Sequence, residues 1–228
     1  MTDRRQFLSA SAAIALSACA TTPLGNIATT EIPPPQWRAG QSWTYRRSDA
    51  YNGLDRGAIT REVESVSERG IRVVTRRANG ATVEDALFAS PGIQLSGTLS
   101  ENGYVVGTFD PPLIRYAFPL VSGKRWEQRM HRTDANQSRY YLAVWSAVEG
   151  WQDVQVNDRT YRAIIVRRTM LLGPTPPEDL ELHREELEWY VPELGTCVRS
   201  RIHEWTVTLL GVEPGYRLNL QLDSFKSA

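Results

Sequence analysis

The densest group of acidic side chains in this 228-residue chain lies between residues 178 and 188. A glycoside hydrolase needs two carboxylates that face each other across the bond to be cleaved. On an extended strand, Glu186 and Glu188 share one face and Glu185 lies on the other. We therefore expect this row of glutamates to form a solvated sheet face, and a glycan-acting enzyme is the less favoured alternative.

A second polar group follows at every other position from Arg199 and comprises Arg201, His203 and Trp205. Two guanidinium groups beside an imidazole and an indole could hold a carboxylate or an anionic head group. On an outward sheet face, the same residues would only keep the protein in solution. We favour this second interpretation.

The spacing of the remaining reactive residues indicates neither a catalytic cysteine nor a metal site. Cys197 would need a neighbouring base to act as a nucleophile, and we expect it to be a buried, small apolar residue. His131, His183 and His203 lie on separate segments without the spacing of metal ligands. The chain also lacks a Gly-x-Ser-x-Gly elbow, a phosphate-binding glycine loop and a dinucleotide fingerprint. We expect no catalytic residue, no metal and no cofactor.

Seven tryptophans are spread along the chain. An exposed indole can stack on a ligand while its N–H group stays hydrated. Trp145 and Trp189 share strand faces with apolar residues, and we expect them and most other tryptophans to lie in the core. Polar neighbours on the same strand face make Trp43, Trp126 and Trp205 the candidates for lining a ligand cavity.

From residue 37 onward, apolar residues recur almost entirely at every second position. The clearest case is 216–223, where four apolar side chains alternate with four polar ones. An antiparallel sheet that is covered on one side requires this alternation. Turn signals such as Asp110-Pro111-Pro112 separate the segments. Strands are expected at 42–47, 59–67, 71–76, 140–148, 161–172, 184–191, 197–209 and 216–223.

About ten closely spaced strands predict an all-β antiparallel meander, either a curved sheet or half-barrel or a sandwich. No segment after residue 18 has a helical period with caps. We expect one domain over residues 37–228, because about 190 residues is within the range of a single all-β domain.

The N-terminal segment has the pattern of a targeting signal rather than that of a folded element. Arg4 and Arg5 are followed by Phe7 and Leu8, then by an uncharged run with small residues before Cys19. This arrangement, with an apolar run too short to cross a bilayer, resembles a bacterial lipoprotein export signal. The arginine pair with Phe7 and Leu8 resembles the twin-arginine signals, and the general secretory route is the alternative.

This resemblance implies that residues 1–18 are removed and that Cys19 is acylated, for example with palmitate. Ala20 stands where an aspartate would resemble the inner-membrane retention signal, so the resemblance implies the periplasmic side of the outer membrane. The segment 19–36 is rich in proline and lacks apolar periodicity, which predicts a flexible tether. Anchoring is expected through the lipid on Cys19.

Charge adds little to this description. The chain has 26 basic and 26 acidic residues and a formal net charge of zero. A neutral chain gives no electrostatic reason to expect nucleic acid as a partner.

The segment 119–126 looks like the P-L-x-x-G-x-x-W motif that opens a strand in uncharacterised proteobacterial envelope proteins. Segments 151–166 and 189–195 fit the same pattern, although residues 157–160 replace that family's P-A-G-T turn. The resemblance covers the chain from about residue 37 and implies a β-rich exported lipoprotein without catalytic residues to transfer. We expect a non-catalytic lipoprotein that binds a hydrophobic or amphipathic ligand, and an interaction or scaffold lipoprotein of an envelope assembly is the alternative.

Overall fold

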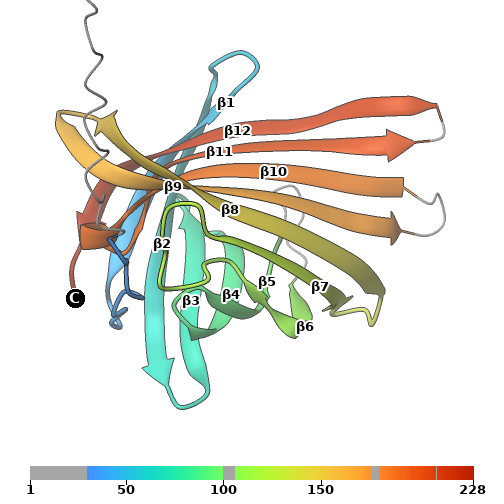
Figure 1. Ribbon diagram of the computed structural model, residues 1–228, viewed down its shortest axis with the longest axis horizontal. Coiled ribbons are helices and arrows are strands. Elements are labelled where there is room, and N and C mark those ends of the chain that lie inside the picture. The colour runs from blue at the N-terminus through green and yellow to red at the C-terminus, as the bar shows by residue number, and fades with distance from the viewer. Residues whose placement is uncertain (1–29, 100–105, 176–179, 209) are drawn as a thin grey trace, which may run out of the picture.

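The computed structural model describes residues 30–99, 106–175, 180–208 and 210–228 (Figure 1). Within these residues, twelve strands form one antiparallel sheet in which each strand pairs with the next in the chain. The first strand also pairs with the last, so the sheet closes into a barrel. The signal and lipidation residues predicted at Arg4, Arg5, Phe7, Leu8 and Cys19 lie outside the described residues.

The bounds of the strands follow the chain with one short 3₁₀ turn, η1, between the tenth and eleventh. They are β1 (Ser42–Asp49), β2 (Asp55–Ser67), β3 (Gly70–Arg77), β4 (Thr82–Ser90), β5 (Ile93–Gly97), β6 (Gly107–Ile114), β7 (Arg125–Asp134), β8 (Arg139–Val156), β9 (Arg159–Thr175), β10 (Leu180–Val191), η1 (Pro192–Leu194), β11 (Thr196–Thr208) and β12 (Gly211–Lys226).

The prediction of a single all-β antiparallel meander is confirmed, but the sheet is neither a half-barrel nor a sandwich. Closure depends on the pairing of β1 with β12, in which Ser42 lies opposite Lys226 and Asp49 opposite Leu218. Hydrophobic periodicity shows which face of a strand is buried and not which distant strand is its neighbour. The closed barrel is therefore a correction to the predicted architecture.

The expected strand ranges leave out β4, β5, β6 and β7, although the motif at 119–126 indicated a strand where β7 begins. Asp110-Pro111-Pro112 was predicted to be a turn but lies within β6. Its pairing with β7 ends at Asp110, and its pairing with β5 shifts register between Gln94 and Ser96. Proline cannot donate a hydrogen bond to a sheet, so it is tolerated where the ladder is interrupted in this way.

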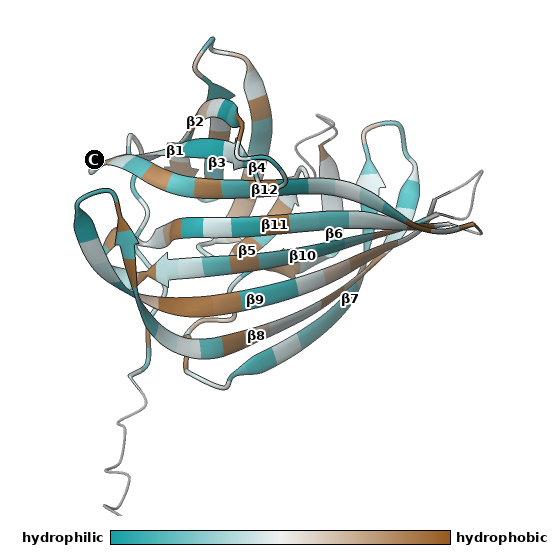
Figure 2. Cartoon of the chain, turned by 90° about the horizontal axis from the view of Figure 1, so that it is seen from above, coloured by the Kyte–Doolittle hydropathy of each residue, from teal (hydrophilic) through white to brown (hydrophobic). Residues whose placement is uncertain are grey.

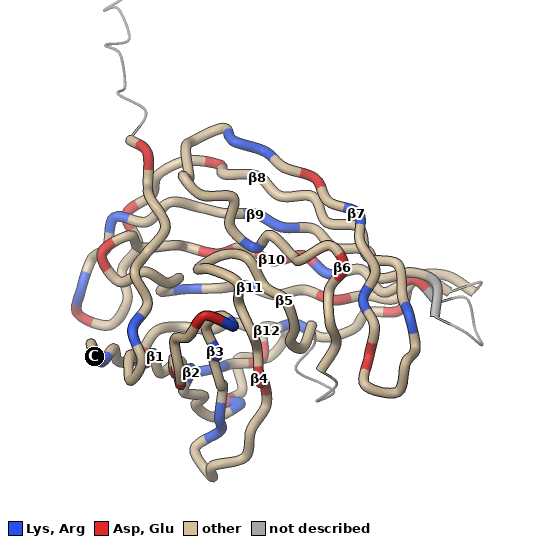
Figure 3. The backbone as a smooth tube through the Cα atoms, turned by 90° about the horizontal axis from the view of Figure 1, so that it is seen from below, with Lys and Arg blue, Asp and Glu red and all other residues tan. Residues whose placement is uncertain are grey.

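Two parts of the barrel differ in strand length (Figure 1). Strands β8 to β12 are 12 to 18 residues long, whereas β3 to β6 have 5 to 9 residues. Figure 2 shows polar and apolar residues alternating along β12, the strand with the clearest period of two. Charged residues of both signs are distributed over the strands rather than gathered on one side (Figure 3).

Apolar side chains fill much of the barrel interior. In the described part of the chain they form three clusters, one around Trp43 and Phe88, one around Leu120 and Tyr190, and one around Met130. Burial of these side chains supplies the main driving force for folding. The charged interior described below lies among these clusters.

The segment 30–36, predicted to be part of the flexible tether, packs against the barrel. Ile32 is only 3% exposed and exchanges two backbone hydrogen bonds with Leu120, at 3.0 and 2.9 Å. The indole N–H of Trp37 donates to the carbonyl of Gly195 at 3.2 Å. The packed domain therefore begins by Ile32, ahead of the predicted boundary at residue 37, because one buried apolar residue among prolines gives no periodic signal.

Among the described residues, no helix is long and apolar enough to cross a membrane.

Candidate functional site

Charged side chains enter the barrel interior from β9, β10 and β11. The side chain of Arg168 on β9 is fully buried, and the register places it directly opposite Glu186 of β10. In the same way, Arg184 of β10 lies opposite Glu204 of β11. Residues that are directly opposite on neighbouring strands are close enough to interact, so the strand register itself creates these ion pairs. We call this part of the barrel, β9 to β11, the paired wall.

Glu186 is at the centre of the ion pairs of the paired wall. Its Oε1 accepts a hydrogen bond from Arg184 Nε at 2.7 Å, and its Oε2 accepts from Arg115 Nη2 at 3.0 Å and from Arg168 Nη1. Burial alone would raise the pKa of Glu186, but the three guanidinium groups outweigh it and hold the pKa well below its usual range. The carboxylate therefore stays ionised at neutral and mildly acidic pH.

Glu188, the next inward residue on β10, is held by the segment that follows β6. Its Oε1 accepts from Arg115 Nη2 at 3.3 Å, and its Oε2 accepts from Tyr116 Oη at 2.9 Å and Arg168 Nη2 at 3.3 Å. Burial and the negative charge of Glu188 raise the pKa of Tyr116. Tyr116 therefore remains a hydrogen-bond donor, and the connection between β6 and β7 is fixed against β10.

The charges of the paired wall balance within the part of the chain that the structure describes. Arg168 and Arg184 of this wall, with Arg115 from the segment after β6, meet three carboxylates, namely Glu186, Glu188 and Glu204. Desolvation of a buried charge is costly unless partners and hydrogen bonds compensate for it. Because each member has a partner of opposite charge, these six groups together are neutral.

A different row of polar residues crosses β2, β3 and β4. The register places Arg61 of β2 opposite Thr75 of β3, and Thr75 opposite Glu84 of β4. The Thr75 hydroxyl donates to Glu84 Oε2 at 3.1 Å. The cation and the anion are thus separated by one strand, and in the described residues they form no ion pair with each other. We call β2 to β4 the unpaired wall.

Aromatic rings hold the guanidinium of Arg61 in place. Its Cζ lies 5.7 Å from the ring centroid of Trp37 and 5.6 Å from that of Phe88, within the range of cation–π contacts. Arg61 Nε is buried and has no hydrogen-bond partner. As far as the structure describes the chain, no carboxylate lies within ion-pair distance of Arg61. The faces of the Arg61 guanidinium are therefore covered by aromatic rings, while its N–H donors remain unused among the described residues.

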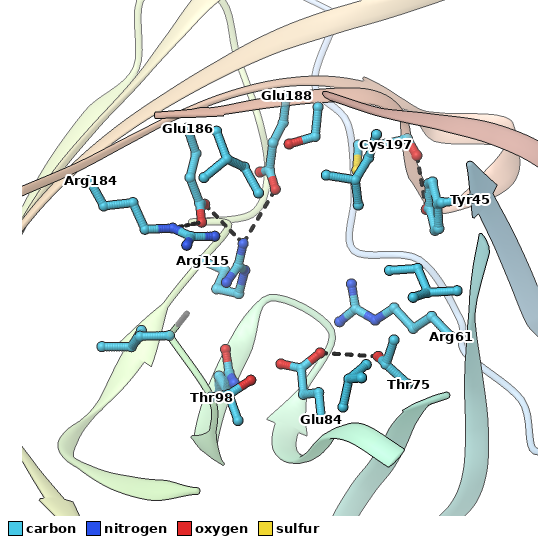
Figure 4. Close-up of a pocket in the computed structure, with 17 residues that line it drawn as sticks. Tyr45, Arg61, Thr75, Glu84, Thr98, Arg115, Arg184, Glu186, Glu188 and Cys197 are labelled. Atoms are coloured by element: carbon cyan, nitrogen blue, oxygen red, sulfur yellow. Dashed lines mark hydrogen bonds and ion pairs between the residues drawn. The ribbon is translucent and has the colours of Figure 1, made fainter. Parts of the chain in front are cut away.

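The two walls enclose a cavity of about 120 Å³ (Figure 4). Figure 4 shows Glu186, Glu188 and Arg115 on one side of this space and Arg61, Thr75 and Glu84 on the other. Its apolar lining comprises Ile59, Val83, Leu99, Ile202 and Leu220. A pocket with an apolar lining and a few convergent polar groups is the usual form of a small-ligand site. This cavity is the candidate functional site.

Cys197 also lines the cavity, beside Tyr45. Burial and the negative charge of Glu188 raise the pKa of the Cys197 thiol to about 12. The Tyr45 hydroxyl donates to the Cys197 carbonyl at 2.9 Å and forms a second hydrogen bond with Thr196 Oγ1 at 2.7 Å. Burial raises the pKa of Tyr45 as well. The thiol is therefore protonated at neutral pH, which is the opposite of what an activated nucleophile requires.

None of the tryptophans predicted to line a cavity lines this one. Trp43 is 1% exposed in the core, and its N–H donates to the Leu194 carbonyl at 3.2 Å. Trp126 is half-buried and donates to the Ile114 carbonyl at 3.0 Å. Trp205 lies on the outer side of β11, where its ring stacks on that of His183 at 5.3 Å. The indoles are used for packing, and the cavity is built from shorter polar and aliphatic side chains.

Two other expectations from strand alternation are overturned. Glu186 and Glu188 were expected on a solvated face but are 1% and 5% exposed, because Arg168 and Arg184 neutralise them inside the barrel. Trp145 was expected in the core but is 40% exposed. Alternation identifies the two faces of a strand, but it assigns a face wrongly when charges are paired inside.

The remaining sequence-based candidates lie outside the cavity wall. Arg199 and Arg201 lie over the ring of Trp189 at 5.8 and 5.4 Å, and His203 packs on Trp205 at 4.9 Å. Trp189 itself is buried, as predicted. In the described ranges, no three His, Cys, Asp or Glu side chains converge to hold a metal ion.

No family model and no curated protein matches this chain. Its fold is similar to that of a predicted exported protein with a YmcC-like fold from Bacteroides fragilis, at 18% identity and a TM-score of 0.53 over 87% of this chain and 100% of that one. It is also similar to a predicted lipoprotein from Parabacteroides distasonis, at 16% identity and a TM-score of 0.51 over 86% and 99%. The hypothetical lipoprotein YmcC from Escherichia coli matches at 14% identity and a TM-score of 0.44 over 83% and 90%. At these identities, the two matches with TM-scores above 0.5 show a shared fold alone.

Proposed function

We propose that the protein is a non-catalytic binding protein whose barrel interior holds a small amphipathic ligand. The observation that carries this proposal is the cavity between the paired and unpaired walls, which combines aliphatic side chains with charged groups that have unused hydrogen-bonding capacity. Apolar surface supplies affinity in such sites, and a few placed polar groups supply orientation.

The volume of the cavity limits the size of the ligand. At about 120 Å³ it is smaller than the roughly 150 Å³ cavity that accommodates benzene, and well below the 300–1,000 Å³ of sites for drug-sized molecules. A long acyl chain does not fit in this space. The ligand proposed here is therefore small and amphipathic, rather than the fully hydrophobic molecule that the sequence also allowed.

The state of the ionisable groups supports binding over catalysis. Each carboxylate of the paired wall is held by guanidinium groups, and Glu186 has a lowered pKa, so it is a poor general acid. The Cys197 thiol has a raised pKa and is a poor nucleophile. These groups are suited to structure and recognition.

Native mass spectrometry of the mature chain, extracted in mild detergent, tests this proposal. We expect a small additional mass on the wild-type protein and its loss in Val83→Phe, which fills the cavity. Val66→Phe is the matched control, because Val66 is 51% exposed on β2 and the added volume lies outside the barrel. A bare mass for both the wild-type protein and Val66→Phe would contradict the proposal.

We further propose that the protein is anchored through a lipid on Cys19 at the periplasmic side of the outer membrane. The support is the N-terminal signal pattern, together with a fold shared with proteins named as exported proteins or lipoproteins. Cys19→Ser is expected to move the protein from the membrane fraction to the soluble periplasmic fraction. Retention of Cys19→Ser in the membrane would refute lipid anchoring.

The choice of export route is tested by replacing Arg4 and Arg5 with lysine. This change keeps the basic start of the signal and removes only the arginine pair. We expect export to stop, since the twin-arginine route is the one proposed. Undiminished export would assign the protein to the general secretory route.

An interaction protein is the second candidate function. The observation that favours it is the hairpin between β11 and β12, where Leu210 is 98% exposed and Val212 is 66% exposed. Exposed apolar residues at one tip can contact a partner in an envelope assembly. Crosslinking from this hairpin in intact cells, with Leu210→Ser as the comparison, distinguishes this function from ligand binding.

A further inference from the structure

The carboxylates of the paired wall are already compensated by guanidinium groups. Glu186 already contacts Arg115, Arg168 and Arg184, and Glu188 contacts two of the same three groups. A ligand that engaged these residues would have to break buried ion pairs, and a separated buried charge is strongly unfavourable. Recognition within the cavity must therefore depend on the unpaired wall.

Arg61 supplies an available cation on the unpaired wall. Trp37 and Phe88 contact its guanidinium at 5.7 and 5.6 Å and limit its movement, so little conformational entropy remains to be lost on binding. Its Nε is buried without a partner, and the described residues provide no carboxylate for it. A planar guanidinium with free donors is suited to a carboxylate.

Glu84 and Gln94 supply available acceptors on the same side of the cavity. In the described part of the chain, Glu84 accepts a hydrogen bond only from Thr75 and forms no ion pair. Gln94 is fully buried on β5, and its Nε2 donates to the Ser96 carbonyl at 3.2 Å, which fixes the orientation of the amide. Its Oε1 is then a buried acceptor without a partner. Both residues line the cavity, and each presents an acceptor oxygen to a hydrogen-bond donor of the ligand.

The spacing of the row separates the cation from the anion by the width of a small molecule. Neighbouring strands lie about 4.8 Å apart, so Arg61 and Glu84, two strands apart, have backbones separated by roughly 10 Å. Thr75 between them has a short side chain and itself lines the cavity. A ligand that lies over Thr75 can reach both ends of the row.

We propose that the cavity binds a small amino acid-like zwitterion, with its carboxylate on Arg61 and its ammonium group on Glu84 and Gln94. This inference rests on the proposed binding function and names the ligand class. Charge complementarity favours a zwitterion, because Arg61 and Glu84 together are neutral and a dianion such as phosphate would be repelled by Glu84. The aliphatic lining at Ile59 and Val83 accepts a short apolar side chain.

A matched series of probes tests this inference on the mature chain in mild detergent. The series comprises l-valine, 2-hydroxy-3-methylbutyrate with a hydroxyl in place of the ammonium, valinol without the carboxylate, and isobutylamine. Glycine, l-alanine and l-serine test smaller side chains. A ligand that binds only the folded state raises the unfolding temperature with its concentration, so tryptophan fluorescence during heating measures binding to each probe.

We expect at least one amino acid to raise the unfolding temperature and its analogue without the carboxylate to have no effect. Arg61→Met should weaken binding about tenfold or more, and Arg61→Lys should restore part of it. Glu84→Gln should weaken binding of the amino acid more than that of the hydroxy acid. If the hydroxy acid binds as tightly as the amino acid and Glu84→Gln weakens the binding of neither, the proposal of a zwitterionic ligand is wrong.

The failure of this inference can be distinguished from failure of the proposed function. If none of the probes binds but a small mass of another class accompanies the wild-type protein and is lost in Val83→Phe, the function stands and the ligand class is overturned. If no probe binds and no mass is found, both are overturned.

Discussion

The two walls of the cavity contain the same residue types and use them in opposite ways. On the paired wall, Arg168 and Glu186 lie on adjacent strands directly opposite each other and form a buried ion pair. On the unpaired wall, Arg61 and Glu84 are kept apart by Thr75 on the strand between them. One intervening strand thus decides whether an arginine and a glutamate stabilise the fold or remain available to a ligand.

The largest expected effect is the loss of stability when the paired wall is broken. Arg168→Met leaves Glu186 and Glu188 with fewer partners in the interior, and removal of one member of a buried pair costs about 3–5 kcal/mol. Chemical denaturation measures this loss as a decrease in the free energy of unfolding. Arg162→Met is the control, because its pair with Asp153 is exposed and is worth about 1 kcal/mol or less. Equal losses for the two variants would mean that the paired wall does not stabilise the barrel.

A smaller effect is expected from pH, with the sign set by Glu186. Its pKa in the folded protein is below the ordinary value of 4.5, so the unfolded chain binds more protons in the interval between the two. The stabilisation is fully present above about pH 4.5 and decreases as the pH falls below that value. Denaturation at pH 7 and at acidic pH should show that Glu186→Gln is less stable than the wild type at pH 7 and that the gap narrows in acid. A gap that widens in acid would contradict the lowered pKa.

The matching change on the unpaired wall is expected to have little effect on stability. Arg61→Met removes cation–π contacts worth about 0.5–1 kcal/mol each, but it also removes an unsatisfied buried donor, so the free energy of unfolding should change by about 1 kcal/mol or less. Chemical denaturation of Arg61→Met and Arg168→Met without ligand compares the effect of the same substitution on the two walls. A loss as large as that of Arg168→Met would make Arg61 a structural residue.

The sequence alone predicted the strands of both walls except β4, which carries Glu84, and it did not predict the site. Alternation correctly located the strands that carry Arg61, Thr75, Arg168 and Glu186, because the covered face of a sheet repeats every two residues. It failed at β6, where two prolines lie within a strand whose ladder is interrupted. The alternation of apolar and polar residues indicates which face of a strand is buried. It does not indicate which other strands lie beside it.

The site depends on information that only the register provides. Arg168 and Glu186 become partners because β9 and β10 pair at those positions. Arg61 has no carboxylate partner among the described residues, because Thr75 occupies the position opposite it. Glutamates are mostly exposed in proteins, so a solvated face was the reasonable expectation for Glu186. The signal that could have changed it is Arg168, an arginine on the same face of the preceding predicted strand, together with Arg184 on the face of Glu186 itself.

The smallest expected effect uses Cys197 as a reporter between the walls. Burial and Glu188 on the paired wall raise the pKa of the thiol, whereas Arg61 on the unpaired wall lowers it. Arg61→Met should therefore raise the pKa further and slow alkylation by iodoacetamide at a fixed alkaline pH, because the thiolate is the reacting form. Glu84→Gln, beyond Thr75 in the row, serves as the control and should change the rate less. Faster alkylation in folded Arg61→Met would show that the charge of Arg61 does not reach the thiol, and that its guanidinium acts on this side of the cavity only by covering it.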